Sequence, residues 1–314
     1  MTDVSPTGGQ LLDQAADVLQ GAQGLIDRSL SALKAKTLDS GKLSNARLDD
    51  YQLVSYELSL CWAECCAARF MLDHSRACAD AFTSRLCALF CAEAVTASCA
   101  RLRTRLADFE LADADVAAVL NEHAAFLASQ LSAANIAAIG EEVVDRGADL
   151  GPDLLEERYT MMRDTFHKFA DDVVMPLAEE VHRQDLIIPD AILQPLRDMG
   201  VFGLSIPESY GGLQEDDKED TMGMIVVTEE LSRGSLGAAG SLITRPEILA
   251  RALLKGGTEE QKQHWLPQLA IGEPLCAVAV TEPNYGSDVA GVKLRATPTE
   301  GGWLLNGAKT WCTF

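Results

Sequence analysis

The residues best suited to chemistry lie in two short segments near residue 314. The first, residues 281–288 (TEPNYGSD), follows the apolar run 275–280, which is typical of a buried strand. Pro283 and Gly286 predict an irregular path for this loop. Its hydroxyl groups and successive backbone amides are suited to binding an anion, because such amides form a positive concavity. A tight turn between two strands is the alternative interpretation.

The second segment, residues 308–314 (AKTWCTF), is predicted to be a further strand. Trp311 and Thr313 alternate with Thr310 and Cys312, so the indole and the Thr313 hydroxyl would share one face. A flat aromatic side chain beside a hydroxyl suits contact with a planar ring and a hydrogen bond to its polar edge. An ordinary core tryptophan is the alternative here.

Both segments belong to a region where a β pattern replaces a helical one. Val292, Leu294 and Ala296 alternate with polar residues, which indicates a strand with one packed face and one solvent-exposed face. Residues 300–302 (EGG) predict a turn, and Asn-Gly at 306–307 is a strong hairpin signal. We expect a sheet of about four strands. Its unpaired edge at residue 314 would favour association, so we expect either a fragment of a longer protein or a sheet completed by a partner chain.

Residues 1–150 show a helical pattern and nothing that indicates chemistry. An apolar stripe at steps of three and four runs through residues 12–26, as expected for one face of a helix. Residues 63–131 lack glycine and proline and are rich in alanine, which favours long, closely packed helices. The sequence GADLGP at 147–152 is a helix stop. We therefore expect domains at 1–150, 151–272 and 273–314.

The second block shows clear helix boundaries. Residues 197–203 (RDMGVFG) end a helix, and 206–212 (IPESYGG) form an irregular loop. Thr258 and Gln261 fit a capping box that opens another helix, and Pro267 is expected to stop it.

Composition narrows the possible functions. With 26 basic and 47 acidic residues, the net charge is −21, which opposes binding to nucleic acid or anionic lipid. No positive leader followed by an apolar stretch indicates a signal peptide, and no run is long enough to cross a membrane; we expect a cytoplasmic protein. Seven of nine cysteines lie between Cys61 and Cys99 and are predicted to be buried thiols. His74 and His123 stand alone, so no metal site is expected.

A series of motifs now points to a family. In order, they are IPESYGG (206–212), EELS (229–232), GTEEQKQ (257–263), LPQLA (266–270), GE (272–273), TEP (281–283), GSD (286–288) and LNGAKTW (305–311). Each is weak alone, but the set in this order and spacing is specific. From residue 156 to 314 the chain resembles the first half of an acyl-CoA dehydrogenase. Residues 1–150 lie outside the common family pattern, and such a helical extension resembles that of a short-branched-chain member.

The resemblance implies an α+β fold: an acyl-CoA dehydrogenase-like helical domain, followed by the start of a β-barrel or sandwich domain and preceded by an extra all-helical domain. It also implies FAD as the cofactor. By matched position, the flavin ring would contact Val278, Val280, Thr281, Trp311 and Thr313, and the loop residues Gly286 and Ser287 would lie at its pyrophosphate. Ser287 would also lie near the CoA chain of the substrate.

The implied reaction is the α,β-dehydrogenation of a short branched acyl-CoA, with electrons passed to an electron-transfer flavoprotein and a homodimer or homotetramer as the assembly. The family's base is a glutamate on a C-terminal helical domain that no residue here matches, so this chain alone is expected to be inactive. Arg245 is a candidate to pair with a second carboxylate of the substrate and so offset the free-energy cost of burying that charge. The alternative is an arginine that lies at the surface or contacts CoA. Three alternative functions remain open: another short-chain acyl-CoA dehydrogenase, an acyl-CoA oxidase, and a helical interaction module in residues 1–150.

Overall fold

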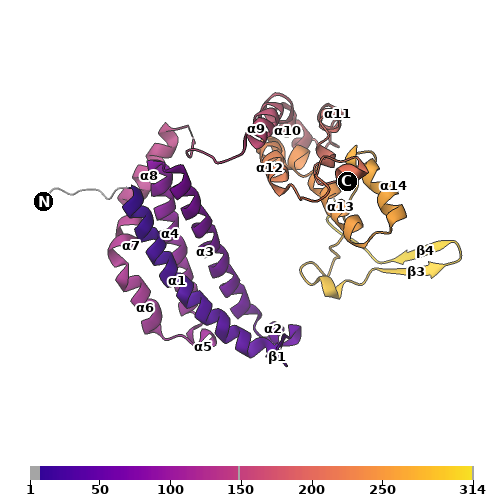
Figure 1. Cartoon of the computed structure of the whole chain (residues 1–314). Helices are drawn as coiled ribbons and strands as arrows, with labels where there is room; N and C mark the ends of the chain where they lie inside the picture. Colours follow the sequence, from indigo (N-terminus) through magenta and orange to yellow (C-terminus); the bar gives the residue numbers. More distant parts are fainter. Residues whose placement is uncertain (1–7, 148, 313–314) are drawn as a thin grey trace. The chain divides into compact units, whose positions relative to one another are not determined.

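The computed structural model describes residues 8–147 and 149–312 (Figure 1). The chain divides into two compact units, Met1–Leu154 and Leu155–Phe314, here called unit 1 and unit 2. Within the described residues both units are mainly helical, and sheet structure is confined to two antiparallel hairpins. The expected fold class, helical domains followed by a short β segment, is confirmed.

Unit 1 is a bundle built on three long helices that lie side by side, α1, α3 and α4 (Figure 1). Its elements are α1 (Gly8–Thr37), β1 (Leu38–Asp39), β2 (Lys42–Leu43), α2 (Asn45–Asp50), α3 (Gln52–Cys78), α4 (Ala81–Arg103), α5 (Leu106–Phe109), α6 (Asp113–Glu122), α7 (Ala124–Gln130) and α8 (Ala133–Asp145).

The core of unit 1 follows the predicted stripe of α1. Leu12, Ala15 and Ile26 are at most 4% exposed, which agrees with a spacing of three and four residues on one helical face. The prediction of long helices between residues 63 and 131 is confirmed as far as Arg103 and wrong beyond it. Thr104 caps α4, and Glu110 ends α5 in the left-handed region at φ 55°. The rest of unit 1 therefore packs as shorter helices against the three long ones.

The prediction of buried thiols between Cys61 and Cys99 is confirmed for five of the seven cysteines and wrong for Cys66 and Cys78, which are only half-buried. Five cysteines on α3 and α4 are fully buried and none is in a disulfide: Cys61, Cys65, Cys87, Cys91 and Cys99. Burial raises the pKa of Cys61 and of Cys99 to about 11, because the thiolate loses its hydration. These side chains act as small apolar core residues between closely packed helices.

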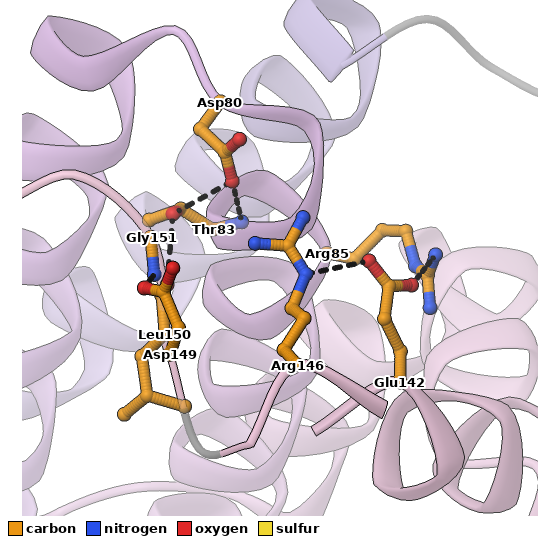
Figure 2. A network of polar contacts seen from close by, with 8 residues as sticks. All are labelled: Asp80, Thr83, Arg85, Glu142, Arg146, Asp149, Leu150 and Gly151. Carbon is orange, nitrogen blue, oxygen red and sulfur yellow. Dashed lines mark hydrogen bonds and ion pairs between the residues drawn. The ribbon is translucent and has the colours of Figure 1, made fainter. Parts of the chain in front are cut away.

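A polar network fixes the end of unit 1 to the start of α4 (Figure 2). The Asp80 carboxylate caps α4 by accepting from the backbone N–H of Thr83 at 2.8 Å, and the Thr83 hydroxyl donates to the carbonyl oxygen of Leu150 at 3.2 Å. Glu142 is paired with both Arg85 and Arg146. The segment that follows α8 is thereby held against the bundle.

Unit 2 contains short helices followed by the second hairpin. Its elements are α9 (Glu157–Phe169), the π-helical turn η1 (Ala170–Val174), α10 (Met175–Arg183), α11 (Asp190–Asp198), the 3₁₀ turns η2 (Val201–Gly203) and η3 (Glu208–Tyr210), α12 (Thr221–Ser235), the π-helical turn η4 (Leu236–Gly240), α13 (Thr244–Gly256), α14 (Glu259–Ala270), the 3₁₀ turn η5 (Val289–Gly291), β3 (Arg295–Thr299) and β4 (Gly302–Asn306).

The helix boundaries of unit 2 were predicted with one error. The capping box is confirmed: the Thr258 hydroxyl accepts from Gln261 N, and Gln261 accepts from Thr258 N. The predicted stop at Pro267 is wrong, since α14 continues to Ala270. Proline removes one helical hydrogen bond, but Leu266 and Leu269 on either side are buried and hold this turn in the core.

The β region departs furthest from the prediction. Residues 275–280 and 308–312 form no strand. Within the part of the chain that the structure describes, β3 and β4 pair only with each other, and the hairpin closes at residues 300–301. Both strands are exposed on both faces, so the expected packed face is absent from the described residues. Asn-Gly at 306–307 ends β4 instead of forming a hairpin turn. A strand needs a neighbour to bond its amides, and among residues 8–147 and 149–312 the apolar run at 275–280 has none.

Candidate functional site

The two segments singled out for chemistry meet at a buried carboxylate. Glu282 is 6% exposed, and its two oxygens accept from the backbone N–H groups of Lys293 at 2.7 Å and Leu294 at 2.8 Å. The Lys309 ammonium lies 3.1 Å from the same carboxylate. These backbone hydrogen bonds, with the Lys309 charge, hold the pKa of Glu282 below its usual value. Glu282 is therefore an ionised acceptor at neutral pH.

Lys309 and Thr310 connect this carboxylate to the predicted ring-binding residues. The Lys309 ammonium also donates to the carbonyl oxygen of Val280 at 2.7 Å. The backbone N–H of Thr310 donates to the carbonyl oxygen of Thr281 at 2.9 Å. The structure thus brings residues 280–282 and 309–310 side by side, although they are far apart along the chain and neither is in a strand.

The predicted ring-binding residues are accessible in this arrangement. Val278 and Thr281 are half-buried, Val280 is 45% exposed, and the Trp311 indole is 87% exposed. Trp311 has φ 61°, the left-handed region, which does not continue a strand. The predicted alternation of Trp311 and Thr313 on a strand is therefore wrong at Trp311, and Thr313 lies outside the described residues.

The loop after Glu282 is a tight, irregular turn, as its sequence predicts. Glu282 and Tyr285 exchange both backbone hydrogen bonds, at 2.9 and 3.1 Å. Gly286 and Ser287 follow and are exposed, and the Ser287 carbonyl accepts from Val289 N at the start of η5. The Ser287 hydroxyl and the loop amides are thus accessible to a ligand beside the Thr281 segment.

Arg245 lies in the first turn of α13 and is half-buried. Its guanidinium donates to the carbonyl oxygen of Ser241. Burial lowers the pKa of Arg245, and the influence of Cys276 opposes this shift. Cys276 precedes Val278 by two residues, so Arg245 belongs to the surroundings of the same segment.

A second polar cluster, which sequence reasoning missed, joins α9, η1 and α12. Glu230 is 7% exposed and accepts from Arg233 and from His167, both at 2.9 Å. Arg233 also contacts Asp171 at 2.8 Å. Glu230 belongs to the EELS motif, and this motif is the sequence signal that could have identified it. All its partners are side chains of unit 2, so the cluster holds these helices together.

The roles of Glu282 and Lys309 were also missed. Both belong to motifs that indicated the family, TEP and LNGAKTW. A single sequence, however, does not indicate which of its charged residues contact each other. Chemically, the site offers a flat indole, the exposed Val280 side chain beside the half-buried Thr281, and an exposed loop with a serine hydroxyl. These groups suit a planar ring with a polar edge and an anionic extension. Among residues 8–147 and 149–312, no cluster of His, Cys, Asp or Glu is suited to a metal ion.

Known proteins show which family this region matches. Residues 156–273 match the family described as acyl-CoA dehydrogenase, N-terminal domain. The chain is 36% identical to the (2S)-methylsuccinyl-CoA dehydrogenase of Cereibacter sphaeroides, over 98% of this chain and 57% of that protein. It is 35% identical to the mitochondrial 2-methylacyl-CoA dehydrogenase of Solanum tuberosum, over 51% of this chain and 38% of that protein. A solved structure of glutaryl-CoA dehydrogenase with glutaryl-CoA is 31% identical, covers 51% of this chain and 40% of that chain, and has a TM-score of 0.45.

The family expected from the motifs is confirmed for residues 156–273, which match the acyl-CoA dehydrogenase N-terminal domain. It spans 57% of the length of the Cereibacter sphaeroides protein. A match over 98% of the chain must include nearly all of unit 1, whereas a match over 51% leaves about half the chain without a counterpart. Among the described residues, no helix is long and apolar enough to cross a membrane.

Proposed function

We propose that this chain is the N-terminal part of an FAD-dependent acyl-CoA dehydrogenase that converts (2S)-methylsuccinyl-CoA to mesaconyl-CoA and passes the electrons to an electron-transfer flavoprotein. The observation that carries the proposal is the match to the Cereibacter sphaeroides enzyme along both units. In this proposal the protein is a cytoplasmic homo-oligomer. Other short-chain acyl-CoA dehydrogenases and acyl-CoA oxidases are the alternatives within the same fold.

The residues of the candidate site fit FAD. The Trp311 indole and the Val280 side chain expose an apolar surface that a tricyclic ring would cover, and the half-buried Thr281 lies beside them. The exposed loop at Gly286 and Ser287 offers amides and a hydroxyl to the pyrophosphate. When bound, FAD supplies the acceptor for a hydride from the substrate's β-carbon.

The contribution of this chain is to position the ring and the thioester. Removal of the α-proton needs a carboxylate on the opposite face of the substrate, and alignment of the two groups supplies much of the rate gain. We assign no residue of this chain as the base. In the family it is a glutamate of the C-terminal helical domain, so these 314 residues alone are expected to lack turnover.

Arg245 is our candidate for the second carboxylate of the substrate. A buried carboxylate needs a compensating cation, and Arg245 is a half-buried cation near residues 276–278. Arg245→Met is expected to raise KM for a dicarboxylic thioester more than KM for butyryl-CoA. Arg251→Met is the matched control, since Arg251 is an arginine of the same helix that contacts Glu219 and Glu247. Equal effects on both substrates would contradict the assignment.

The proposed function is tested by the visible spectrum of the purified intact protein. We expect a flavin spectrum after addition of FAD, and bleaching by methylsuccinyl-CoA under anaerobic conditions. A protein that stays colourless after FAD addition contradicts the enzyme function. Bleaching by butyryl-CoA but not by methylsuccinyl-CoA contradicts the proposed substrate. Rapid reoxidation of the reduced flavin by oxygen favours an oxidase.

One observation favours a second function, a homo-oligomerisation module in unit 1. The outer face of α3 carries an apolar stripe at heptad spacing, distinct from its buried face. The stripe consists of Leu53, Tyr56, Leu60, Ala63, Ala67 and Phe70. Three of these side chains, Leu53, Tyr56 and Phe70, are 61–74% exposed, so they are accessible to a partner along the stripe.

The order of sizes in this stripe suits a second copy of the same helix. In an antiparallel pair centred between residues 61 and 62, Tyr56 faces Ala67 of the other copy and Leu60 faces Ala63. Large side chains thus meet small ones next to the twofold axis, and farther from the axis Leu53 faces Phe70. The flanking carboxylates of Glu57 and Glu64 are both paired with Arg101, which reduces their repulsion across such a pair.

The subunit mass tests this second function. Leu60→Lys is expected to reduce the oligomeric state of the intact protein while leaving turnover per flavin unchanged. Leu30→Lys is the control, because Leu30 is an exposed α1 residue outside the stripe. An unchanged mass for the Leu60 variant contradicts self-pairing through α3.

A further inference from the structure

Glu282 organises a part of the chain that has no regular structure to hold it. Residues 275–288 and 307–312 lie outside any named helix or strand, and most of their side chains are exposed. Against this background, Glu282 and Lys309 stand out, because their side chains are only 6% and 19% exposed. A buried ion pair in an otherwise exposed segment indicates a specific arrangement, since desolvating both charges is unfavourable without good partners.

The contacts of the pair that the structure records are all with neighbouring residues of unit 2. The Glu282 carboxylate binds two consecutive amides, at Lys293 and Leu294, and the Lys309 ammonium. Its backbone exchanges hydrogen bonds with Tyr285. These contacts tie the pair to the chain on both sides of Thr281, so a change in the pair would act on the neighbouring residues.

Thr281 is the residue that this arrangement fixes. The Lys309 ammonium binds the carbonyl oxygen of Val280 on one side of Thr281 and the carboxylate of Glu282 on the other. The carbonyl oxygen of Thr281 accepts from Thr310 N. Trp311 follows directly, so Thr281 and Trp311 are coupled through a few short contacts.

We propose that Glu282 and Lys309 are a positioning pair that holds the Thr281 side chain and the Trp311 indole in register against the flavin ring. The inference rests on the proposed function, because it needs a planar cofactor at this site. The pair itself does not touch the ring. It replaces the strand pairing that would otherwise align the two segments, and it does so with charge-assisted hydrogen bonds, which are stronger and more directional than neutral ones.

The test is FAD binding to variants of the intact protein. Lys309→Met removes both hydrogen bonds of the ammonium and is expected to weaken FAD binding about tenfold, the lower end of the effect of losing one hydrogen bond to a charged group. We also expect an altered flavin absorption band and a lower kcat with little change in KM for the thioester. Lys309→Arg, which keeps a cation able to donate twice, is expected to restore most of the affinity and the wild-type band.

The matched control is Lys293→Met. Its ammonium lies 5.5 Å from the Tyr285 ring, and only the backbone N–H of Lys293 binds Glu282. This variant also loses one positive charge near the site but keeps the pair. We expect wild-type FAD affinity and spectrum, which separates positioning from a general effect of charge.

The outcomes separate this inference from the proposed function. If the wild-type protein binds FAD and Lys309→Met binds it equally well with the same spectrum, the positioning role is wrong and the proposed function stands. The same conclusion follows if Lys309→Arg fails to restore binding, or if Lys293→Met weakens it as much. A wild-type protein that binds no FAD overturns the proposed function, and the inference with it.

Discussion

Unit 1 and the segment after α14 are held together by opposite means. In unit 1, apolar stripes on α1, α3 and α4 bury a continuous core, and even its cysteines serve as small apolar groups. In residues 273–312, the strands are exposed on both faces and the fixed point is an ion pair with two backbone amides. Burial is non-directional, whereas hydrogen bonds to a carboxylate fix geometry. The first arrangement suits a scaffold and the second suits a binding site.

The thiols provide the largest expected difference between the two regions. Cys99 is 1% exposed with a pKa of about 11, so at pH 8 roughly one in a thousand of its side chains is the reactive thiolate. Cys312 is exposed. We expect an aromatic disulfide reagent to modify Cys312 at least about a hundredfold faster than Cys99, measured by mass spectrometry of timed digests. Comparable rates would show that the unit 1 core opens readily.

Truncation of a core side chain is expected to have the next largest effect. Phe109 is 1% exposed within the unit 1 core, so Phe109→Ala should destabilise unit 1 by about 3–5 kcal/mol. Urea unfolding followed by circular dichroism measures this change. A loss below about 1 kcal/mol would contradict the view that burial, rather than its surface ion pairs, stabilises this unit.

Acidification is expected to release the residues around Glu282. The folded pKa of this carboxyl lies below its ordinary value of 4.5, so its stabilising contribution is complete above 4.5 and is lost as the pH falls through the lower folded value. The amide resonances of Lys293 and Leu294 should shift together with a midpoint below 4.5. Glu282→Gln is the control; an identical transition in that variant would exclude Glu282 as its origin.

The smallest effect is expected at the hairpin surface. Trp303 on β4 is 66% exposed, so Trp303→Ser should change the free energy of unfolding by less than about 0.5 kcal/mol. Thermal unfolding of the intact protein gives the value. A large loss of stability would mean that another segment covers Trp303 in the intact protein. The difference between the Trp303 and Phe109 variants would then depend on that segment.

Local signals predicted most of the helical fold. The stripe of α1, the capping box at Thr258 and the helix end near Asp198 each depend on residues a few positions apart, and each is confirmed. Pro267 was misjudged because burial of its neighbours outweighs one lost hydrogen bond. The family and the convergence of residues 281 and 310 also followed from motifs.

The pairing inside the site could not be predicted in the same way. Glu282 and Lys309 are 27 positions apart, and nothing in the periodicity of either segment specifies the partner. The apolar run at 275–280 was interpreted as a strand because its residues favour β structure, but a strand also needs a neighbour. Propensity describes one segment, whereas pairing depends on two.

The five buried thiols have a practical consequence for handling this protein. Cys87 and Cys91 have their sulfur atoms 3.9 Å apart within the core, and three further buried cysteines lie on α3 and α4. Heat or denaturant would expose all of them at once, and in air they would cross-link in non-native combinations before the chain refolds. Reversible melting should therefore require a reductant.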